Sequence, residues 1–469
     1  MSDSSGSAAA TIAVRSDGAL KRQLGLSAVV ALVAGNMLGS GVFFTPGELA
    51  AVAQHPWQVH FIWALCGLIT LCGALTLAEL CRLLPHAGAT YHVLREGYSP
   101  LWGFVLVWME LWVSGPGSVA GIAIAFGEFM QRVVGSSVNI PPVWWGAAAI
   151  AFFAAINLAG VNWGGRVQVL VTTVKVAGIV ALIAGALLLA APAAASAVTP
   201  TEAPGGSGAL SFFRFVGLGV AAVLFTYDGW IDVSHVAGEV RRPGRDLPLG
   251  MAIGVGALTL LYLVVNVAFL RVVPLAEMRA APATIASTVA TAAYGPRGGP
   301  WLDVLMMVSI FGALGGLVMT LPRLFYTMAD AHAAESRGAL RWFFSGMGRV
   351  ATRTATPNTA ILFTAATSIA ALLFFGSFSR LVNFFVVPFQ AMNILMVFAI
   401  FRLRPRYPAA VGYRTPGYPF TPMVFIVVMA AFLVSAVAAR PLETLIGTAL
   451  ALTGIPVYWW LVHVKPSPS

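Results

Sequence analysis

The chain has few charged residues and few cysteines. Only 9% of its 469 residues are charged, whereas soluble domains average about 25%. The three cysteines, Cys66, Cys72 and Cys81, lie in or beside one apolar stretch, with no cluster of histidines or carboxylates at metal-binding spacing. We therefore expect no structural disulfide, no metal site and no cofactor. Hydrophobic residues make up 59% of the chain, which leaves no region polar enough for a separate soluble domain.

Apolar windows of about 20 residues recur along the whole chain, and this is the length that a helix needs to cross a hydrocarbon core about 30 Å thick. They predict an all-α integral membrane protein with twelve spans. The expected spans are 25–53, 58–81, 101–131, 143–160, 167–191, 212–238, 247–271, 300–329, 358–376, 381–401, 422–439 and 443–463.

The net charge of +10 is unevenly distributed along the chain. With the N-terminus inside, 18 of the 27 Lys and Arg residues fall in cytosolic loops and tails, seven fall outside and two fall within spans. This asymmetry follows the positive-inside rule and predicts a multi-pass protein of the cell inner (plasma) membrane with both termini cytosolic. It also accounts for the basic balance without nucleic acid. The expected partners are the lipid bilayer and a small molecule.

Two apolar segments are interrupted near their middles, the first by Gly39-Ser40-Gly41 and the second by Tyr227-Asp228-Gly229. Backbone N–H and C=O groups are not left bare in lipid, so such breaks are tolerated where they line a protein cavity. Matching breaks in two halves of a chain indicate a carrier with a midplane binding site between inverted repeats. Taken alone, the first break also fits a close-packing surface between helices.

The chemistry of the two breaks fits a zwitterion. Unwinding exposes the N–H groups of Ser40 and Gly41 at the start of a half-helix, which favours an anion. The carbonyl groups near Met37 face the same gap and favour a cation, and Phe225 and Asp228 supply further carbonyls. An α-amino acid carries both charges on one carbon, so it is the expected solute.

These motifs resemble those of a known superfamily. Gly39-Ser40-Gly41-Val42-Phe43 resembles the first-span signature of the amino acid–polyamine–organocation (APC) superfamily. Tyr227-Asp228-Gly229-Trp230, followed by Glu239 and Arg242-Pro243, resembles its L-type amino acid transporter (LAT) branch, in a bacterial form. Further similarity runs in order from about residue 22 to residue 462, including Glu110-Leu111, Arg166-Val167-Gln168, Arg323-Leu324-Phe325-Tyr326 and Pro416-Gly417-Tyr418-Pro419.

The resemblance implies the leucine-transporter (LeuT) fold, in which spans 1–5 and 6–10 are inverted repeats with discontinuous helices 1 and 6, and two further spans are added. The expected regions are a disordered cytosolic tail (1–22), the first repeat (23–191), an external linker (192–211), the second repeat (212–402), a cytosolic loop (403–421), spans 11 and 12 (422–463) and a cytosolic tail (464–469).

The resemblance also implies a substrate site. The substrate carboxylate is expected at the N–H groups of Ser40 and Gly41, the ammonium at the carbonyls of the two breaks, and the ring of Phe225 as a gate over the substrate. The full set of expected substrate-binding residues is Met37, Gly39, Ser40, Gly41, Phe225, Tyr227, Asp228 and Trp230.

Lys175 lies within the fifth span, by helical rise roughly 13 Å beyond Arg166. A lysine at this depth is costly and usually faces an interior cavity with a partner, although a snorkelling side chain is the alternative. The resemblance implies that its ammonium stands where sodium-coupled relatives bind sodium and tethers the first span. The carrier is therefore expected to be sodium-independent. Whether Lys175 also carries a proton stays open.

Several other residues have two interpretations. Asp228 is either the N-cap of the following half-helix or a side-chain contact that favours cationic or polar substrates. Trp230 either shapes the pocket floor or packs. Ile231 and Phe389 stand where relatives have polar residues, which favours small or apolar substrates. Three glutamates are expected at helix ends and in intracellular contacts rather than at the substrate: Glu79, Glu110 and Glu239.

The leading interpretation is a sodium-independent exchanger of neutral L-amino acids that works by alternating access. The alternative is a proton-coupled or cationic amino acid or polyamine carrier of the same fold, and a more remote one is an amino acid sensor. An enzyme would need converging catalytic groups, and a channel would need repeated rings of charge or carbonyls; the sequence predicts neither. The link 133–142 lacks the cysteine that joins animal relatives to a glycoprotein, so no disulfide-linked heavy subunit is expected.

Overall fold

The computed structural model describes residues 20–39, 41–135, 138, 140–192, 209–280, 284–332, 338–375, 378–408, 412–439 and 441–463. Within these residues the chain is helical and contains one isolated parallel bridge, between Leu24 and Val240. The all-α class is therefore confirmed. The expected tails and external linker fall almost wholly outside the described residues.

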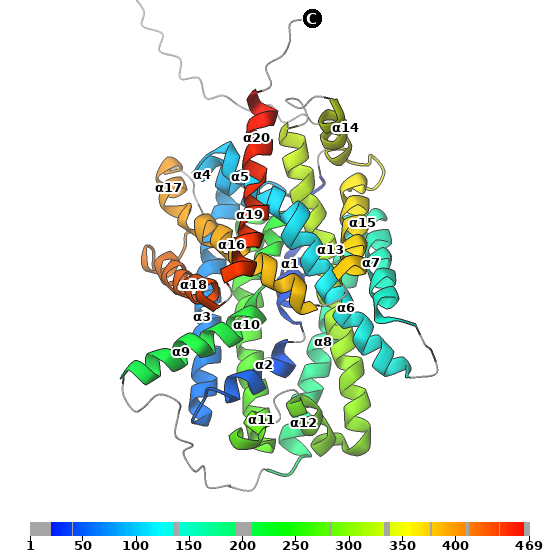
Figure 1. The fold of residues 1–469 in the computed structure, drawn as a ribbon, viewed down its shortest axis with the longest axis vertical. Helices are drawn as coiled ribbons and strands as arrows, with labels where there is room; N and C mark the ends of the chain where they lie inside the picture. Colours follow the sequence, from blue (N-terminus) through cyan, green and yellow to red (C-terminus); the bar gives the residue numbers. More distant parts are fainter. Residues whose placement is uncertain are drawn as a thin grey trace, which may run out of the picture.

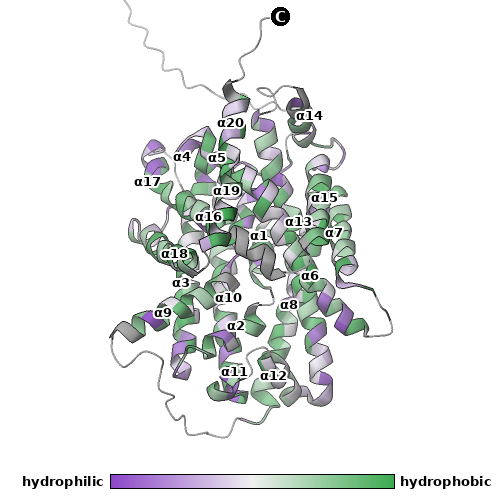
Figure 2. Ribbon diagram, viewed as in Figure 1, coloured by the Kyte–Doolittle hydropathy of each residue, from purple (hydrophilic) through white to green (hydrophobic). Residues whose placement is uncertain are grey.

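The long helices form one bundle whose middle is mainly hydrophobic and whose ends are more polar (Figure 1, Figure 2). Their bounds are α3 (Pro56–Leu83), α5 (Pro100–Met109) continuing into α6 (Gly115–Val134), α8 (Val161–Leu188), α10 (Pro243–Val272), α13 (Gly298–His332), α16 (Phe378–Phe398), α18 (Phe420–Ala439), α19 (Pro441–Leu452) and α20 (Gly454–His463). The short helices α4 (Ala89–Gly97), α14 (Gly338–Met347) and α17 (Ile400–Arg406) lie at one end of the bundle, and α11 (Leu275–Ala280) and α12 (Ile285–Tyr294) at the other (Figure 1).

Eight helices in the described part of the chain are long and apolar enough to cross a membrane. The helices α1 (Leu26–Met37) and α2 (Gly41–Ala50) meet at an angle of 44° and, counted together as one broken span, are apolar enough for a ninth crossing. Three shorter apolar helices stand where the fourth, sixth and ninth spans were expected: α7 (Pro142–Leu158), α9 (Ala209–Leu224) and α15 (Asn358–Phe375). The multi-span membrane architecture is confirmed, while the count of twelve stays a prediction.

Helix α1 lies at the centre of the bundle and packs against α8, α10 and α13 (Figure 1). Small residues on α10 allow the close approach, as is common between helices in membranes. A Cβ atom on Gly254 would lie 2.6 Å from a methyl carbon of Val33, and one on Gly250 would overlap Val29. The helix that leads into the first break is therefore held tightly by its neighbours.

Both expected breaks are present. The first separates Met37, the last residue of α1, from Gly41, the first of α2. In the second, α9 ends at Leu224 and the chain continues through two 3₁₀ segments, Phe225–Tyr227 and Asp232–Glu239. Gly229 between them has φ +97°, a conformation that favours glycine. A Cβ on Gly229 would lie 2.9 Å from the carbonyl carbon of Asn36, so the two breaks meet at this residue.

At one end of these elements, backbone hydrogen bonds join the segment before α1 to the segment after the second break. The N–H groups of Gln23 and Leu24 donate to the carbonyl of Glu239 at 2.8 and 2.9 Å, and the N–H of Arg241 donates to the carbonyl of Leu24 at 2.8 Å. The segment before α1 is thus fastened to the segment that follows the second break.

Candidate solute-binding site

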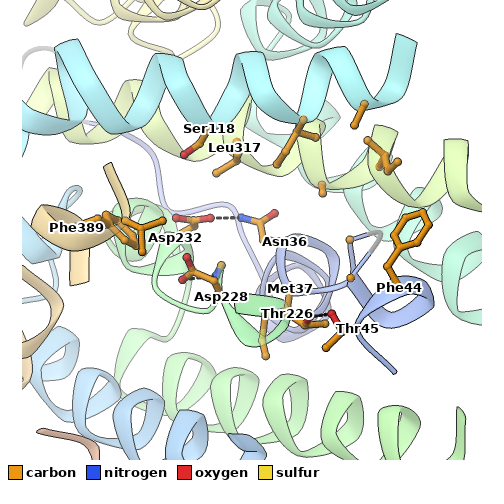
Figure 3. A pocket seen from close by; sticks show the side chains of 18 of the residues that line it. Asn36, Met37, Phe44, Thr45, Ser118, Thr226, Asp228, Asp232, Leu317 and Phe389 are labelled. Atoms are coloured by element: carbon orange, nitrogen blue, oxygen red, sulfur yellow. Dashed lines mark hydrogen bonds between the residues drawn. The ribbon is translucent and has the colours of Figure 1, made fainter. Parts of the chain in front are cut away.

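A cavity of about 800 Å³ lies between the two breaks (Figure 3). This volume is typical of pockets that bind small molecules. The breaks line one side of the cavity, and α6, α13 and α16 line the other. The residues that the two breaks contribute are Asn36, Met37, Gly39, Gly41, Thr226, Asp228 and Gly229.

Helix α6 presents one continuous face to the cavity. The lining residues on it are Gly115, Ser118, Ile122, Ala125, Phe129 and Arg132, a spacing of three and four residues that marks one side of a helix. Glu110 joins this face although it lies five residues before Gly115, because Glu110–Ser114 is a π-helical turn. Such turns are frequent at functional sites. A Cβ on Gly115 would overlap the carbonyl oxygen of Glu110, so glycine is what allows the turn to close.

Five acidic residues line the cavity, and three of them lie at the second break and the π-helical turn: Glu110, Asp228 and Asp232. Asp232 accepts a hydrogen bond of 2.8 Å from Nδ2 of Asn36 (Figure 3), and Oδ1 of Asp228 accepts one of 2.9 Å from the N–H of Gly229. Within the described ranges none of the three forms an ion pair. Carboxyl groups inside a membrane protein are costly and usually pair with another group. The cavity therefore offers these acids to a bound cation or to protons.

The expectation for the three glutamates is wrong for Glu110. Glu79 pairs with Arg404 at 3.4 Å and Glu239 pairs with Arg323 at 2.8 Å, which are contacts between separate helices near their ends. Glu110 instead lines the cavity. The π-helical turn rotates its side chain by one position relative to a regular helix, and nothing in the residue pattern around it predicts that turn.

Four of the predicted substrate-binding residues line the cavity: Met37, Gly39, Gly41 and Asp228. Ser40 lies outside the described residues, as does the side chain of Phe225. Phe389, expected to make the pocket less polar, also lines the cavity. The cavity wall is therefore mixed, with an aromatic ring from α16 on a side that faces the carboxyl groups of the second break (Figure 3).

Tyr227 and Trp230 belong to the second break but lie outside the cavity lining. Tyr227 is buried, and its Oη donates to the carbonyl of Trp63 on α3 at 2.9 Å. Trp230 is also buried and meets the ring of Phe425 on α18 edge-on, with 5.7 Å between centroids. Both side chains fasten the second break to neighbouring helices.

Tyr262 on α10 joins the two breaks from behind the cavity. Its Oη lies 3.0 Å from the carbonyl oxygen of Met37 and 3.4 Å from that of Thr226. In addition, the hydroxyl oxygens of Thr45 and Thr226 lie 2.8 Å apart (Figure 3). The sequence analysis missed these contacts, because a tyrosine or threonine in an apolar helix carries no local sign of a distant partner.

Lys175 lies on the other side of α1 and is fully buried. Its Nζ donates to the carbonyl oxygens of Gly35 at 2.8 Å and Leu38 at 2.9 Å. Oγ of Ser309 on α13 donates to Leu38 at 3.1 Å and lies 3.2 Å from the carbonyl oxygen of Gly39. On the side of α1 that faces α8 and α13, side chains therefore donate hydrogen bonds to the carbonyl groups at the end of the helix. The amino group of Lys175 lies at the end of the first span, as the resemblance implies.

The protein combines apolar helices long enough to cross a membrane with a cavity between two broken helices. This combination is typical of membrane carriers. Residues 24–462 match the model of the amino acid permease family, and the chain belongs to this family. It is 31% identical to the serine/threonine exchanger SteT of Bacillus subtilis over 96% of this chain and 99% of that protein. It is 28% identical to the human b(0,+)-type amino acid transporter 1, over 95% and 89% of the two chains. Identity to the human cystine/glutamate transporter is 26%, over 96% and 87%.

Proposed function

We propose that the protein is a sodium-independent exchanger of L-amino acids, with neutral amino acids as its main substrates. The observation that carries this proposal is the cavity bounded by both breaks. Unwound backbone forms one of its walls, and behind that wall Lys175 donates hydrogen bonds to the carbonyl groups at the end of α1. The relatives named above include a serine/threonine exchanger of nearly the same length. The protein acts in the plasma membrane with both termini cytosolic, and without a disulfide-linked heavy subunit.

The two breaks supply complementary groups for an amino acid. Its carboxylate binds the N–H groups of Ser40 and Gly41 at the start of α2, since the first turn of a helix has unpaired donors and favours an anion. Its ammonium binds carbonyls of the second break, at Phe225 and Asp228, and the Phe225 ring closes over it. Gly41 supports this proposal because it lines the cavity and a side chain there would overlap Thr226.

Sodium independence rests on Lys175. The resemblance places the Lys175 ammonium where sodium-coupled relatives bind sodium. Here an ammonium group already holds the Gly35 and Leu38 carbonyls at hydrogen-bond distance. A second cation beside it would meet a like charge in a buried site, which is strongly unfavourable.

The described conformation fits one state of alternating access. The cavity extends to Glu48 on α2 and to Glu128 and Arg132 on α6, at the ends of spans 1 and 3 that are predicted to be external. At the opposite end the segment before α1 is fastened to the Glu239 backbone. We assign this to an outward-open state, and release to the cytosol requires those backbone bonds to open.

The three carboxylates at the second break and the π-helical turn favour a second candidate, a carrier that also accepts cationic amino acids. A lysine- or arginine-like side chain would supply the positive charge that Glu110, Asp228 and Asp232 lack among the described residues. In this version the cationic group of the substrate side chain binds Asp228, the carboxylate that belongs to the break itself.

Exchange in proteoliposomes tests both candidates. Vesicles loaded with labelled amino acids receive unlabelled serine, leucine or arginine outside, in sodium or choline buffer. Efflux that needs an external amino acid and is equal in both buffers is expected, whereas equal efflux into bare buffer or a sodium requirement would contradict the proposal. Asp228→Asn should reduce exchange of arginine more than that of serine if the second candidate holds. The control is Asp303→Asn, an aspartate of α13 outside the cavity lining.

A further inference from the structure

A second, smaller cavity of about 270 Å³ shares no lining residue with the solute site. Three separate parts of the chain build it: the segment before α1, the turn between α7 and α8, and the loop before α15. The polar or aromatic residues that line it are Gln23, Asn162, Trp163, Arg166, Arg353 and Thr354. None of these residues takes part in the solute site described above.

The second cavity is positively charged. It contains two guanidinium groups, and no residue that lines it is acidic. Within the described ranges neither Arg166 nor Arg353 forms an ion pair. The Arg166 guanidinium lies over the ring of Trp163, 5.6 Å from its centroid. Two arginines that converge on a concave site match the geometry of a phosphate group, which accepts several charge-assisted hydrogen bonds.

The start of α8 adds to the positive potential in the second cavity. Gly160 precedes the helix without a side-chain cap, so the first N–H groups of a 28-residue helix are not satisfied by a capping side chain. The positive end of the helix dipole points to the same cavity that Arg166 and Arg353 line. Three independent features, two guanidinium groups and one helix start, thus favour the same kind of ligand, an anion with several acceptor oxygens.

The surface beside the second cavity indicates where that anion comes from. Trp163, Leu170 and Val174 of α8 are 57%, 63% and 47% exposed. Their spacing of seven and four residues puts them on one face of the helix, so an apolar stripe leads away from the cavity. Aromatic residues at the end of such a stripe are typical of the membrane–water interface. A free phosphate ion makes no apolar contacts with the stripe, whereas the acyl chains of a phospholipid can pack against it.

We propose that this second cavity binds the phosphate group of an anionic phospholipid, whose acyl chains lie along the exposed face of α8. In the orientation proposed above, the site lies in the cytosolic leaflet, where anionic lipids attract basic residues close to the surface. Gln23 lines the cavity and its N–H donates to the Glu239 carbonyl. A bound lipid therefore joins the fastened segment before α1 to the ends of α8 and α15, and it stabilises the closed cytosolic end.

Lipid binding to the purified full-length protein, measured by native mass spectrometry without substrate, tests this proposal. Phosphatidylglycerol is compared with phosphatidylcholine and with inorganic phosphate. The double substitution Arg166→Gln/Arg353→Gln should weaken phosphatidylglycerol binding roughly 30-fold, since each of the two basic groups near an anionic headgroup contributes a factor of about five. The matched control, Arg341→Gln/Arg349→Gln, removes the same charge from exposed positions outside the cavity and should leave binding unchanged.

The outcomes separate the possibilities. Equal binding of the two lipids, or equal losses in the two double variants, would overturn the proposal. Binding of inorganic phosphate that matches phosphatidylglycerol would show an anion site without lipid and would also contradict it. If the double variant does not fold, Arg353→Gln alone, in an exposed loop, should still lower the affinity about fivefold. Because no substrate is present, failure here is independent of any failure in the exchange assay.

Discussion

The two sides of the α1 end differ in how completely their polar groups are used. On one side, Lys175 and Ser309 satisfy the carbonyls of Gly35 and Leu38 in a buried contact. On the other side, Asn36 and Met37 face the solute cavity. We call these the sealed side and the open side. The sealed side fixes the position of the break, so that the open side can present its groups to a solute without rearrangement.

The two sides also carry ionisable groups of opposite kind. The sealed side holds the amino group of Lys175, and the open side faces the carboxyl groups of Glu110, Asp228 and Asp232. Asn36, near the end of the same helix, links the open side to Asp232. The comparison supports the proposal that one helix end serves as a structural joint on one side and as a binding surface on the other.

Breaking the sealed side should have the largest effect. Lys175→Met removes the donor of two hydrogen bonds and leaves buried carbonyls with fewer partners, at a cost of about 1–3 kcal/mol for each unsatisfied group. We expect exchange to fall about 100-fold or more, in line with roughly 3 kcal/mol, with a lower unfolding temperature. Lys21→Met, at an exposed position, is the control. Normal exchange in Lys175→Met would mean that the sealed side does not position the break.

Disturbing the open side from behind should have the next largest effect. A Cβ on Gly316 of α13 would overlap Oδ1 of Asn36, so Gly316→Ala should push Asn36 away from Asp232. Loss of a hydrogen bond to a charged acceptor costs about 1.5–3 kcal/mol, and the concentration for half-maximal exchange should rise about tenfold or more. The control is Gly256→Ala, where a Cβ meets no atom within 4 Å. Unchanged apparent affinity would remove Asn36 from the site.

The link between the two breaks should matter less. Tyr262→Phe removes one hydroxyl that lies near carbonyls of both breaks, worth about 0.5–1.5 kcal/mol. Exchange should fall about threefold to tenfold. Tyr294→Phe is the matched control, because its hydroxyl also donates to a backbone carbonyl, at Ala181, but away from the breaks. Equal losses in the two variants would indicate a general stability effect.

The smallest effect is expected within the sealed side. Ser309→Ala removes a donor to the Leu38 carbonyl, but Lys175 still donates to that oxygen. The change should therefore cost less than about 1 kcal/mol in stability and reduce exchange by no more than about fivefold. Ser287→Ala, on α12, is the control. A loss as large as that of Lys175→Met would show that Ser309, not the lysine, holds the break.

The sequence predicts those parts of the site that neighbouring residues in the chain reveal. The breaks are visible because paired glycines and an aspartate interrupt apolar runs, and Lys175 is visible because it is a lone charge inside a span. Asp232 could have been found by the same rule, since it is an acid four residues after Asp228 in an apolar segment.

Other parts of the site depend on contacts that no local pattern reports. Glu110 reaches the cavity through a π-helical turn, and Asn36 is placed by Gly316, 280 positions later in the chain. Tyr227 and Trp230 were expected in the pocket, but the 3₁₀ geometry of the second break turns them toward α3 and α18. Side-chain direction in an irregular segment follows its backbone angles, which composition does not specify.

The fastening of Leu24 to Glu239 and Arg241 uses main-chain groups alone. Every amino acid except proline carries the same N–H and C=O groups, so these bonds persist through nearly any substitution. Alanine substitutions therefore leave these bonds in place, and any effect of such a substitution comes from the side chain, as with the buried Leu24 or the Glu239 carboxylate that pairs with Arg323. Arg241→Pro deletes one of the N–H donors, and it is the kind of substitution that removes such a main-chain bond.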